Sequence, residues 1–167
     1  MRAATDENRL TLDRLAALGI NEKSVREKLL SSHQGWLCEE QGSVVGFAMG
    51  DRSSGEMWVI AVLPTHIRRG IGGALLEQVE TWLFSEGCSS LWLTTDVDTR
   101  LRAYAFYKEH GWRDWKIENG LRYMKKMRLT MRCSQPLADV PPHFLMTKTQ
   151  SFQATLGSAS GGSSCSR

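Results

Sequence analysis

Apolar residues recur at helical spacing in the first thirty residues of the chain. The leucines of residues 6–18 predict one helix, which Gly19 would end. Asn21 is a suitable N-cap for a second helix over residues 22–31, because its short side chain can accept a hydrogen bond from the first helical turn. The N-terminal part of the chain is therefore expected to be helical.

The pattern then changes to short apolar runs separated by turn residues, which is typical of antiparallel strands. Three such runs cover residues 35–40, 43–51 and 56–63. Gln41-Gly42 predicts a tight hairpin turn between the first two runs, and Ser53-Ser54-Gly55 predicts the next turn. These residues are expected to form a three-stranded meander.

The next part of the chain alternates helices and strands. Apolar residues at helical spacing follow three clustered glycines, and they predict a helix that ends at Gly87. The remaining expected elements are a strand at 91–97, a helix that runs from a cap at Asp98 or Thr99 to His110, and two strands at 112–116 and 121–129.

This order of elements predicts an α/β (α+β) domain over residues 1–131. The succession of strand, helix and strand over residues 56–97 favours a right-handed parallel crossover, which is the usual connection between parallel strands. The sheet is therefore expected to be mixed, with an antiparallel meander and one parallel crossover, and to be flanked by about four helices.

Residues 132–167 differ in composition from the preceding domain. Prolines interrupt the segment, and its last residues are a low-complexity run of serine and glycine. Such a sequence has few apolar groups to bury, so it predicts a poorly ordered tail. The alternative is that the apolar residues 144–146 pack on the domain.

Composition narrows the class of protein. The 167 residues carry a formal net charge of +3 with both signs spread along the chain, so the basic face of a nucleic-acid-binding protein is not expected. The four cysteines are far apart, which favours reduced thiols over a metal site. The N-terminus has no signal-peptide pattern, and the longest apolar run, residues 57–63, is shorter than the roughly 20 residues of a membrane span. We therefore expect a cytoplasmic protein without a membrane or nucleic-acid partner.

The clearest candidate chemistry lies in the glycine-rich turn after the third predicted strand. Gly70, Gly72 and Gly73 open a helix, where unpaired N–H groups and the positive end of the helix dipole favour an anion. A P-loop would need Lys followed by Ser or Thr, and the dinucleotide fingerprint would need glycine at Leu75. The turn therefore predicts a phosphate-bearing ligand that neither common motif accounts for.

Two segments carry a resemblance to a known family. Ile67-Arg68-Arg69-Gly70-Ile71-Gly72 is similar to the pyrophosphate loop Q/R-x-x-G-x-G/A of the GNAT superfamily of acyl-CoA-dependent N-acetyltransferases. Ala103-Tyr104-Ala105-Phe106-Tyr107, followed by Gly111-Trp112, resembles a second segment of that family, A-x-x-[FL]-Y…G-[FW]. The resemblance covers about residues 1 to 130. It departs from the family at Ile67, where Gln or Arg is usual, and at Arg100, where Asn is frequent.

The resemblance implies that acetyl-CoA, with no metal, lies between the predicted strands 56–63 and 91–97. Main-chain groups of Ile60, Ala61 and Val62 would pair with the pantetheine amides. The pyrophosphate would be held by the main-chain N–H groups of Arg68, Arg69, Gly70, Ile71, Gly72 and Gly73. Arg100 and Ala103 would face the cofactor from the following helix.

The resemblance also implies two catalytic residues. Tyr107 matches the tyrosine that donates a proton to the departing sulfur, and Glu56 matches a glutamate that serves as base in several members. Tyr107 could instead be a core tyrosine packed beside Phe106, and Glu56 a solvated carboxylate at a hairpin edge. Asp96 and Asp98 could attract the amine or relay its proton, although Asp98 could equally be a helix cap.

These features predict an enzyme that moves an acetyl group from acetyl-CoA to a primary amine by direct attack in a ternary complex. A small-molecule amine is the favoured acceptor, and a homodimer is expected from the resemblance alone. The alternatives are a protein N-terminal or lysine acetyltransferase and a non-catalytic acyl-CoA-binding sensor. A toxin acting on aminoacyl-tRNA is less favoured, because it would require a coherent basic face.

Overall fold

The computed structural model describes residues 21–128 and 144–148 of the chain. The helix predicted over residues 6–18 lies outside the described residues, as does most of the predicted tail. None of the helices in the described part is long and apolar enough to cross a membrane.

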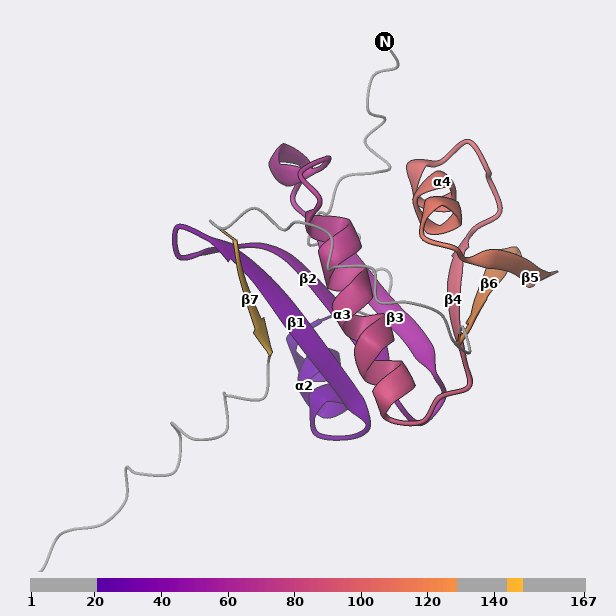
Figure 1. The fold of residues 1–167 in the computed structure, drawn as a ribbon, viewed down its shortest axis with the longest axis horizontal. Coiled ribbons are helices and arrows are strands. Elements are labelled where there is room, and N and C mark those ends of the chain that lie inside the picture. The colour runs from indigo at the N-terminus through magenta and orange to yellow at the C-terminus, as the bar shows by residue number, and fades with distance from the viewer. Residues whose placement is uncertain (1–20, 129–143, 149–167) are drawn as a thin grey trace, which may run out of the picture.

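Seven strands form one mixed sheet in the order β5-β6-β4-β3-β2-β1-β7 (Figure 1). The strands are β1 (His33–Glu40), β2 (Ser43–Asp51), β3 (Glu56–Val62), β4 (Ser90–Asp96), β5 (Arg113–Glu118), β6 (Leu121–Met127) and β7 (Leu145–Lys148). Neighbouring strands are antiparallel except β3 and β4, which are parallel. The predicted meander, the parallel crossover and the mixed fold class are confirmed.

The described α-helices are α2 (Glu22–Leu29), α3 (Ile71–Ser85) and α4 (Arg102–Glu109), and a 3-10 turn, η2, covers Pro64–His66. Asn21 caps α2 as predicted, because its side chain accepts a hydrogen bond from the Ser24 N–H at 2.9 Å. Figure 1 shows α3 in front of the sheet and α2 behind it. The core lies between α3 and the sheet, where Leu75, Val79 and Leu83 are fully buried.

The predicted start of α4 is wrong. The helix begins at Arg102, and its N-cap residue, Leu101, supplies no capping side chain. Asp98 does not cap the helix, because its carboxylate accepts hydrogen bonds from the main-chain N–H and the guanidinium of Arg100. Residues 98–101 therefore form a turn before the helix.

The sheet opens between β3 and β4. Their parallel register contains one residue pair, Glu56↔Trp92, beside a hydrogen bond from the Trp92 N–H to the Gly55 carbonyl. On its other side, β3 pairs with β2 along most of its length, but the register shifts so that Trp58 is an extra residue between Met57 and Val59. Such a bulge bends a strand and increases its twist. The bulge therefore directs β3 away from β4, and the edge of β3 that faces β4 is left open.

Residues 144–148 pack on the domain, which was the alternative to a poorly ordered tail at this point of the chain. β7 pairs antiparallel with β1, and Phe144 is buried in the core. This pairing covers what would otherwise be an exposed sheet edge on β1. The tail residues on either side lie outside the described part of the chain.

Replacing Phe144 should show how much this contact contributes to stability. Phe144→Ala removes a ring that is 6% exposed, so we expect the free energy of unfolding to fall by about 3 kcal/mol. Leu145→Ala is the matched control, because Leu145 is 67% exposed, and its effect should stay within about 0.5 kcal/mol. Urea unfolding measures both values, and equal effects of the two substitutions would contradict the docking of this segment.

Candidate active site

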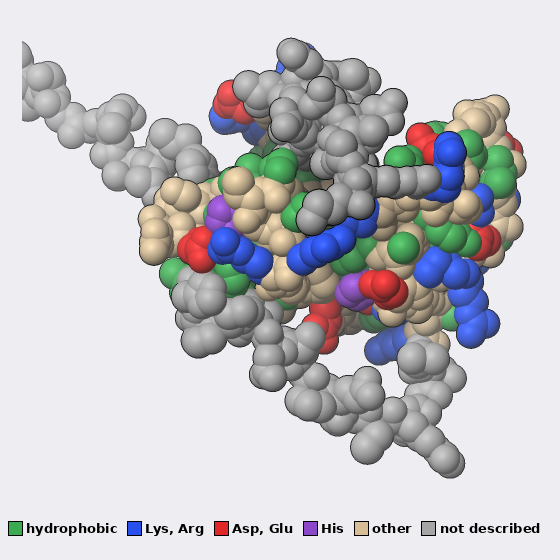
Figure 2. Space-filling view, turned by 90° about the horizontal axis from the view of Figure 1, so that it is seen from above, with side chains coloured by type: hydrophobic (Ala, Val, Ile, Leu, Met, Phe, Trp, Pro, Cys, Tyr) green, Lys and Arg blue, Asp and Glu red, His purple; other side chains and the backbone are tan. Residues whose placement is uncertain are grey.

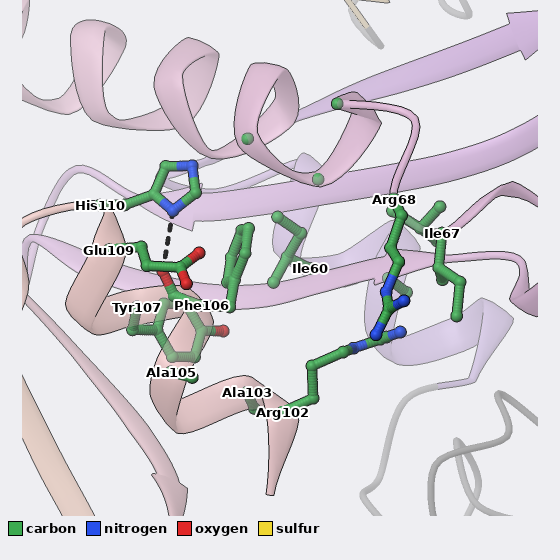
Figure 3. A pocket seen from close by; sticks show the side chains of 15 residues that line it. Ile60, Ile67, Arg68, Arg102, Ala103, Ala105, Phe106, Tyr107, Glu109 and His110 are labelled. Atoms are coloured by element: carbon green, nitrogen blue, oxygen red, sulfur yellow. Dashed lines mark hydrogen bonds between the residues drawn. The ribbon is translucent and has the colours of Figure 1, made fainter. Parts of the chain in front are cut away.

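A cavity of about 550 Å³ lies between the open edge of β3, the glycine-rich turn and α4 (Figure 3). Most of the residues predicted to bind cofactor or to act in catalysis line it: Ile60, Ala61, Val62, Arg68, Gly70, Gly72, Gly73, Ala103 and Tyr107. The fold thus brings the two family-like segments together, although they lie on different elements. The four predicted residues that do not line the cavity are Glu56, Arg69, Ile71 and Arg100.

The glycine-rich turn exposes main-chain N–H groups to the cavity. Arg68 and Gly70 both adopt left-handed backbone conformations, with φ of 65° and 80°, and Gly70 is the N-cap of α3. The first intrahelical bond runs from the Ala74 N–H to the Gly70 carbonyl, so the amides of residues 71–73 precede the helical ladder. The Ile71 side chain is buried in the core, which leaves only its main chain for a ligand.

Close packing against the end of α4 favours glycine at position 73, whereas a Cβ atom at position 72 would make only an ordinary contact. A Cβ atom on Gly73 would lie 2.8 Å from Nε2 of His110, and one on Gly72 would lie 3.5 Å from the Phe106 ring. The Nδ1 atom of His110 lies 2.8 Å from the Phe106 carbonyl oxygen, which can only accept, so Nδ1 carries a proton. The His110 ring is therefore held with Nε2 toward the first turn of α3.

Two arginines that belong to different elements converge at the cavity. Figure 3 shows the guanidinium groups of Arg68 and Arg102 pointing toward one another. Neither has an ion-pair partner among the residues that the structure describes. Two like charges that have no counter-charge among the described residues favour an anionic ligand between them.

Arg69 and Arg100 are engaged elsewhere. Arg69 lies 3.4 Å from a carboxylate oxygen of Glu40, which also contacts Nε2 of His66 at 2.7 Å. Arg100 pairs with Asp98 at 2.8 Å, and its side chain is largely exposed. Arg102 therefore stands where the sequence analysis expected Arg100, because α4 begins later than predicted.

Tyr107 presents its hydroxyl group to the cavity (Figure 3). Its ring is buried against Phe106 and Trp112, with ring centroids 5.3 and 6.1 Å away. Burial disfavours the phenolate and raises the pKa of Tyr107 to about 12. The side chain is consequently protonated at neutral pH, which is the state that a proton donor requires.

Glu56 lies outside the cavity at the start of β3. Four residues of extended strand, about 13 Å, separate it from Ile60. Burial raises the pKa of the Glu56 carboxyl; the charge of nearby Lys28 lowers it and that of Asp51 raises it further. Glu56 shares a sheet face with its parallel partner Trp92. The Lys28 ammonium, whose charge acts on Glu56, lies 4.5 Å from the centroid of the Trp58 ring.

Several residues of the cavity were not predicted from the sequence. Arg102, Ala105, Phe106, Glu109 and His110 also line it, as does Ile67, which had been noted only as a departure from the family pattern. The helical spacing of Phe106 and His110 was visible, but nothing in the sequence showed that this face of α4 meets the first turn of α3. In the described part of the chain, no group of three or more His, Cys, Asp or Glu side chains is placed to hold a metal ion.

An open strand edge, a helix N-terminus and a pair of converging arginines offer main-chain hydrogen bonds and positive charge to an extended anionic ligand. The chain matches the model of the acetyltransferase (GNAT) family over residues 9–112, which is more than half of its length. It therefore belongs to this family, and the predicted family and enzyme class, an acetyltransferase, are confirmed.

Solved structures of N-acetyltransferases share the fold. PaiA N-acetyltransferase from Thermoplasma acidophilum, in complex with coenzyme A, is 18% identical with a TM-score of 0.58, covering 71% of this chain and 80% of that one. Aminoglycoside 6'-acetyltransferase type Ii is 20% identical with a TM-score of 0.60, covering 72% and 87%. The ribosomal-protein-S18-alanine N-acetyltransferase from Escherichia coli is 23% identical with a TM-score of 0.55, covering 70% and 81%. A comparison with curated proteins by sequence found no match.

The raised pKa of Tyr107 has a consequence for stability at alkaline pH. An unfolded tyrosine ionises near pH 10 and the folded one at about 12, so the folded state resists ionisation. The contribution of Tyr107 to the free energy of unfolding is complete below pH 10. It is lost as the pH rises toward 12, and the total loss is at most about 3 kcal/mol. In Tyr107→Phe, the free energy of unfolding should not show this fall above pH 10. Urea unfolding between pH 9 and 11.5 measures the difference, and parallel profiles for the two proteins would show that Tyr107 is not buried as described.

Proposed function

We propose that the protein transfers the acetyl group of acetyl-CoA to a primary amine by direct attack within a ternary complex. The observation that carries this proposal is the meeting of three features in one cavity: the open edge of β3, the N-terminus of α3 and the Tyr107 hydroxyl. The protein is expected to act in the cytoplasm.

The residues of the cavity fit acetyl-CoA in two respects. The main chain of Ile60 to Val62 has no strand partner on the β4 side in the described residues, so it can pair with the pantetheine amides as an added strand would. The amides of residues 71–73, with Arg68 and Arg102, supply N–H donors and positive charge for the phosphates. PaiA N-acetyltransferase, which shares the fold, was solved in complex with coenzyme A.

The reaction needs a neutral amine, a stabilised carbonyl oxygen and a proton for the leaving sulfur. Glu56 takes a proton from the ammonium form of the acceptor, directly or through water, and the free amine then attacks the thioester carbon. As the C–S bond breaks, Tyr107 donates its proton to the sulfur, and the extra proton that attack leaves on the nitrogen passes through water to the Tyr107 phenolate, so that the products are the amide and the free thiol of CoA. A phenol with a pKa of about 12 can do so because the same burial that disfavours the phenolate also disfavours a thiolate beside it.

A small-molecule amine is the acceptor that we favour. The Glu56 carboxylate shares a sheet face with the Trp92 indole and interacts with the charge of Lys28, whose ammonium lies 4.5 Å from the Trp58 ring centroid. Acidic and aromatic groups of this kind suit a compact ammonium group. The names of related structures include both an aminoglycoside acetyltransferase and an enzyme for the alanine of a ribosomal protein. A protein α-amine or lysine is therefore the alternative acceptor, and a non-catalytic acyl-CoA sensor is the alternative function.

Nucleic acid is not part of the proposal. On the face shown in Figure 2, Lys and Arg side chains stand in separate groups beside acidic ones, without one continuous basic surface. A homodimer is compatible with the exposed Trp115 and Ile117 on the edge strand β5, whose side chains are 52% and 60% exposed.

Removing one arginine of the converging pair should weaken cofactor binding. Arg102→Gln deletes a charge that lines the cavity, so the Kd for CoA should rise about tenfold, as expected for a charge-assisted hydrogen bond. Arg100→Gln is the control: it removes the same charge two residues away, outside the cavity, and should leave the Kd within twofold. Calorimetric titration with CoA measures both, and equal effects would mean that Arg102 does not contact the cofactor.

A thiol-release assay tests the function itself. The acceptors are a polyamine, an aminoglycoside, a peptide with a free α-amine and a peptide with an internal lysine. We expect turnover with at least one small amine, and a loss of about a hundredfold or more in kcat for Tyr107→Phe. Glu56→Gln should remove the rise in rate with pH that deprotonation of the base produces. Turnover of peptides alone would favour a protein acetyltransferase, and CoA binding without turnover of any amine would favour the sensor.

A further inference from the structure

A buried carboxylate on α3 binds two partners from a distant part of the chain. Glu80 is 8% exposed, and its Oε1 accepts a hydrogen bond from the indole Nε1–H of Trp112 at 2.7 Å. Its Oε2 accepts another from the Lys126 ammonium at 2.5 Å. The same ammonium donates to the main-chain carbonyl of His110 at 2.8 Å. Both carboxylate oxygens are therefore paired, and one lysine links α3 to the end of α4.

These contacts join the two sides of the open sheet. α3 packs mainly on β1, β2 and β3, whereas Trp112 and Lys126 belong to the side that contains α4, β6 and β4. Within the sheet itself, the two sides are connected by the single residue pair Glu56↔Trp92. The Glu80 contacts add a polar connection between them, beside the packing of α3 on β4 and of Gly72 and Gly73 against the end of α4.

Trp112, which Glu80 binds, also contacts Tyr107. The Trp112 ring meets the Tyr107 ring edge-on at a centroid distance of 6.1 Å, and the main-chain N–H of Trp112 donates to the main-chain carbonyl of Tyr107 at 3.0 Å. Trp112 is 1% exposed, so it has little room to move once Glu80 holds its indole. The Lys126 contact fixes the His110 carbonyl, and the His110 ring faces the first turn of α3. Glu80 is thus positioned to determine where α4 stands relative to β3.

We propose that Glu80 is a positioning residue for acetyl transfer. With Lys126 and Trp112 it forms a clasp that sets the width of the cleft between β3 and α4, and thereby the place of the Tyr107 hydroxyl relative to the thioester. The proposal rests on the proposed function, because it assumes that Tyr107 is the proton donor. A merely structural ion pair would instead change the stability of the protein without changing the rate of the folded enzyme.

The test is a double-mutant cycle between Glu80→Gln and Tyr107→Phe. Glutamine keeps the size of the side chain and an acceptor for Trp112, but it removes the charge that holds Lys126. We expect Glu80→Gln to lower kcat about tenfold or more in the natural sequence and to have little further effect when Tyr107 is already Phe, since both act on one proton transfer. The KM for acetyl-CoA should change less than kcat, because α3 and β3 still hold the cofactor.

Glu77→Gln, one helical turn earlier on α3, is the matched control and should leave kcat unchanged. Trp112→Phe, which removes only the indole donor and some ring volume, replaces Glu80→Gln in the cycle if that variant fails to fold. An equal loss of kcat in both Tyr107 backgrounds, or no loss in either, would overturn the proposal.

If no amine is turned over, the proposed function fails. A second measurement then tests separately whether Glu80 positions Tyr107. The pKa of Tyr107 is then read from the ultraviolet difference between each protein and its Tyr107→Phe counterpart. Opening of the clasp admits water and should lower that pKa from about 12 toward 10 in Glu80→Gln. An unchanged pKa would show that Glu80 does not position Tyr107.

Discussion

The structure depends on the early separation of β3 from β4. A parallel pair normally satisfies its main-chain groups along its whole length, and here it does so at one residue pair, Glu56↔Trp92. The bulge at Trp58 bends β3 while β2 still holds its other edge. The result is a row of main-chain donors and acceptors that faces a cavity instead of a strand. Pantetheine, which carries amides along an extended arm, is the kind of ligand that such an edge can bind.

The glycine-rich turn, where the phosphates would lie, combines features that are unfavourable without a ligand. Arg68 is a non-glycine residue with a left-handed backbone, and its guanidinium points toward that of Arg102. The amides of residues 71–73 precede the helical ladder. A polyanionic ligand would offset the like-charge repulsion and accept hydrogen bonds from these amides. Farther along α3, Glu80 joins that helix to the part of the chain that carries Tyr107 through its hydrogen bonds with Trp112 and Lys126.

Much of the fold and site follows from local chemistry and could be predicted from the sequence. The glycines that open α3, the strand that precedes them and Tyr107 on the next helix are all encoded within short segments. What could not be predicted depends on contacts between distant residues. Asp98 binds Arg100 instead of capping α4, so Arg102 reaches the cavity. The same holds for the pairing of β7 with β1 and for the partners of Glu80, since no pattern near either segment shows what it will contact.

Amide hydrogen exchange with and without CoA tests the central claim most directly, because it detects main-chain recognition without requiring an acceptor. The account predicts that exchange slows on the open edge of β3, residues 57–62, and in the first turn of α3, residues 71–73. The β5–β6 hairpin should be unaffected. Unchanged exchange at both places while CoA binds, or protection confined to other elements, would contradict the assignment of this cavity to the cofactor.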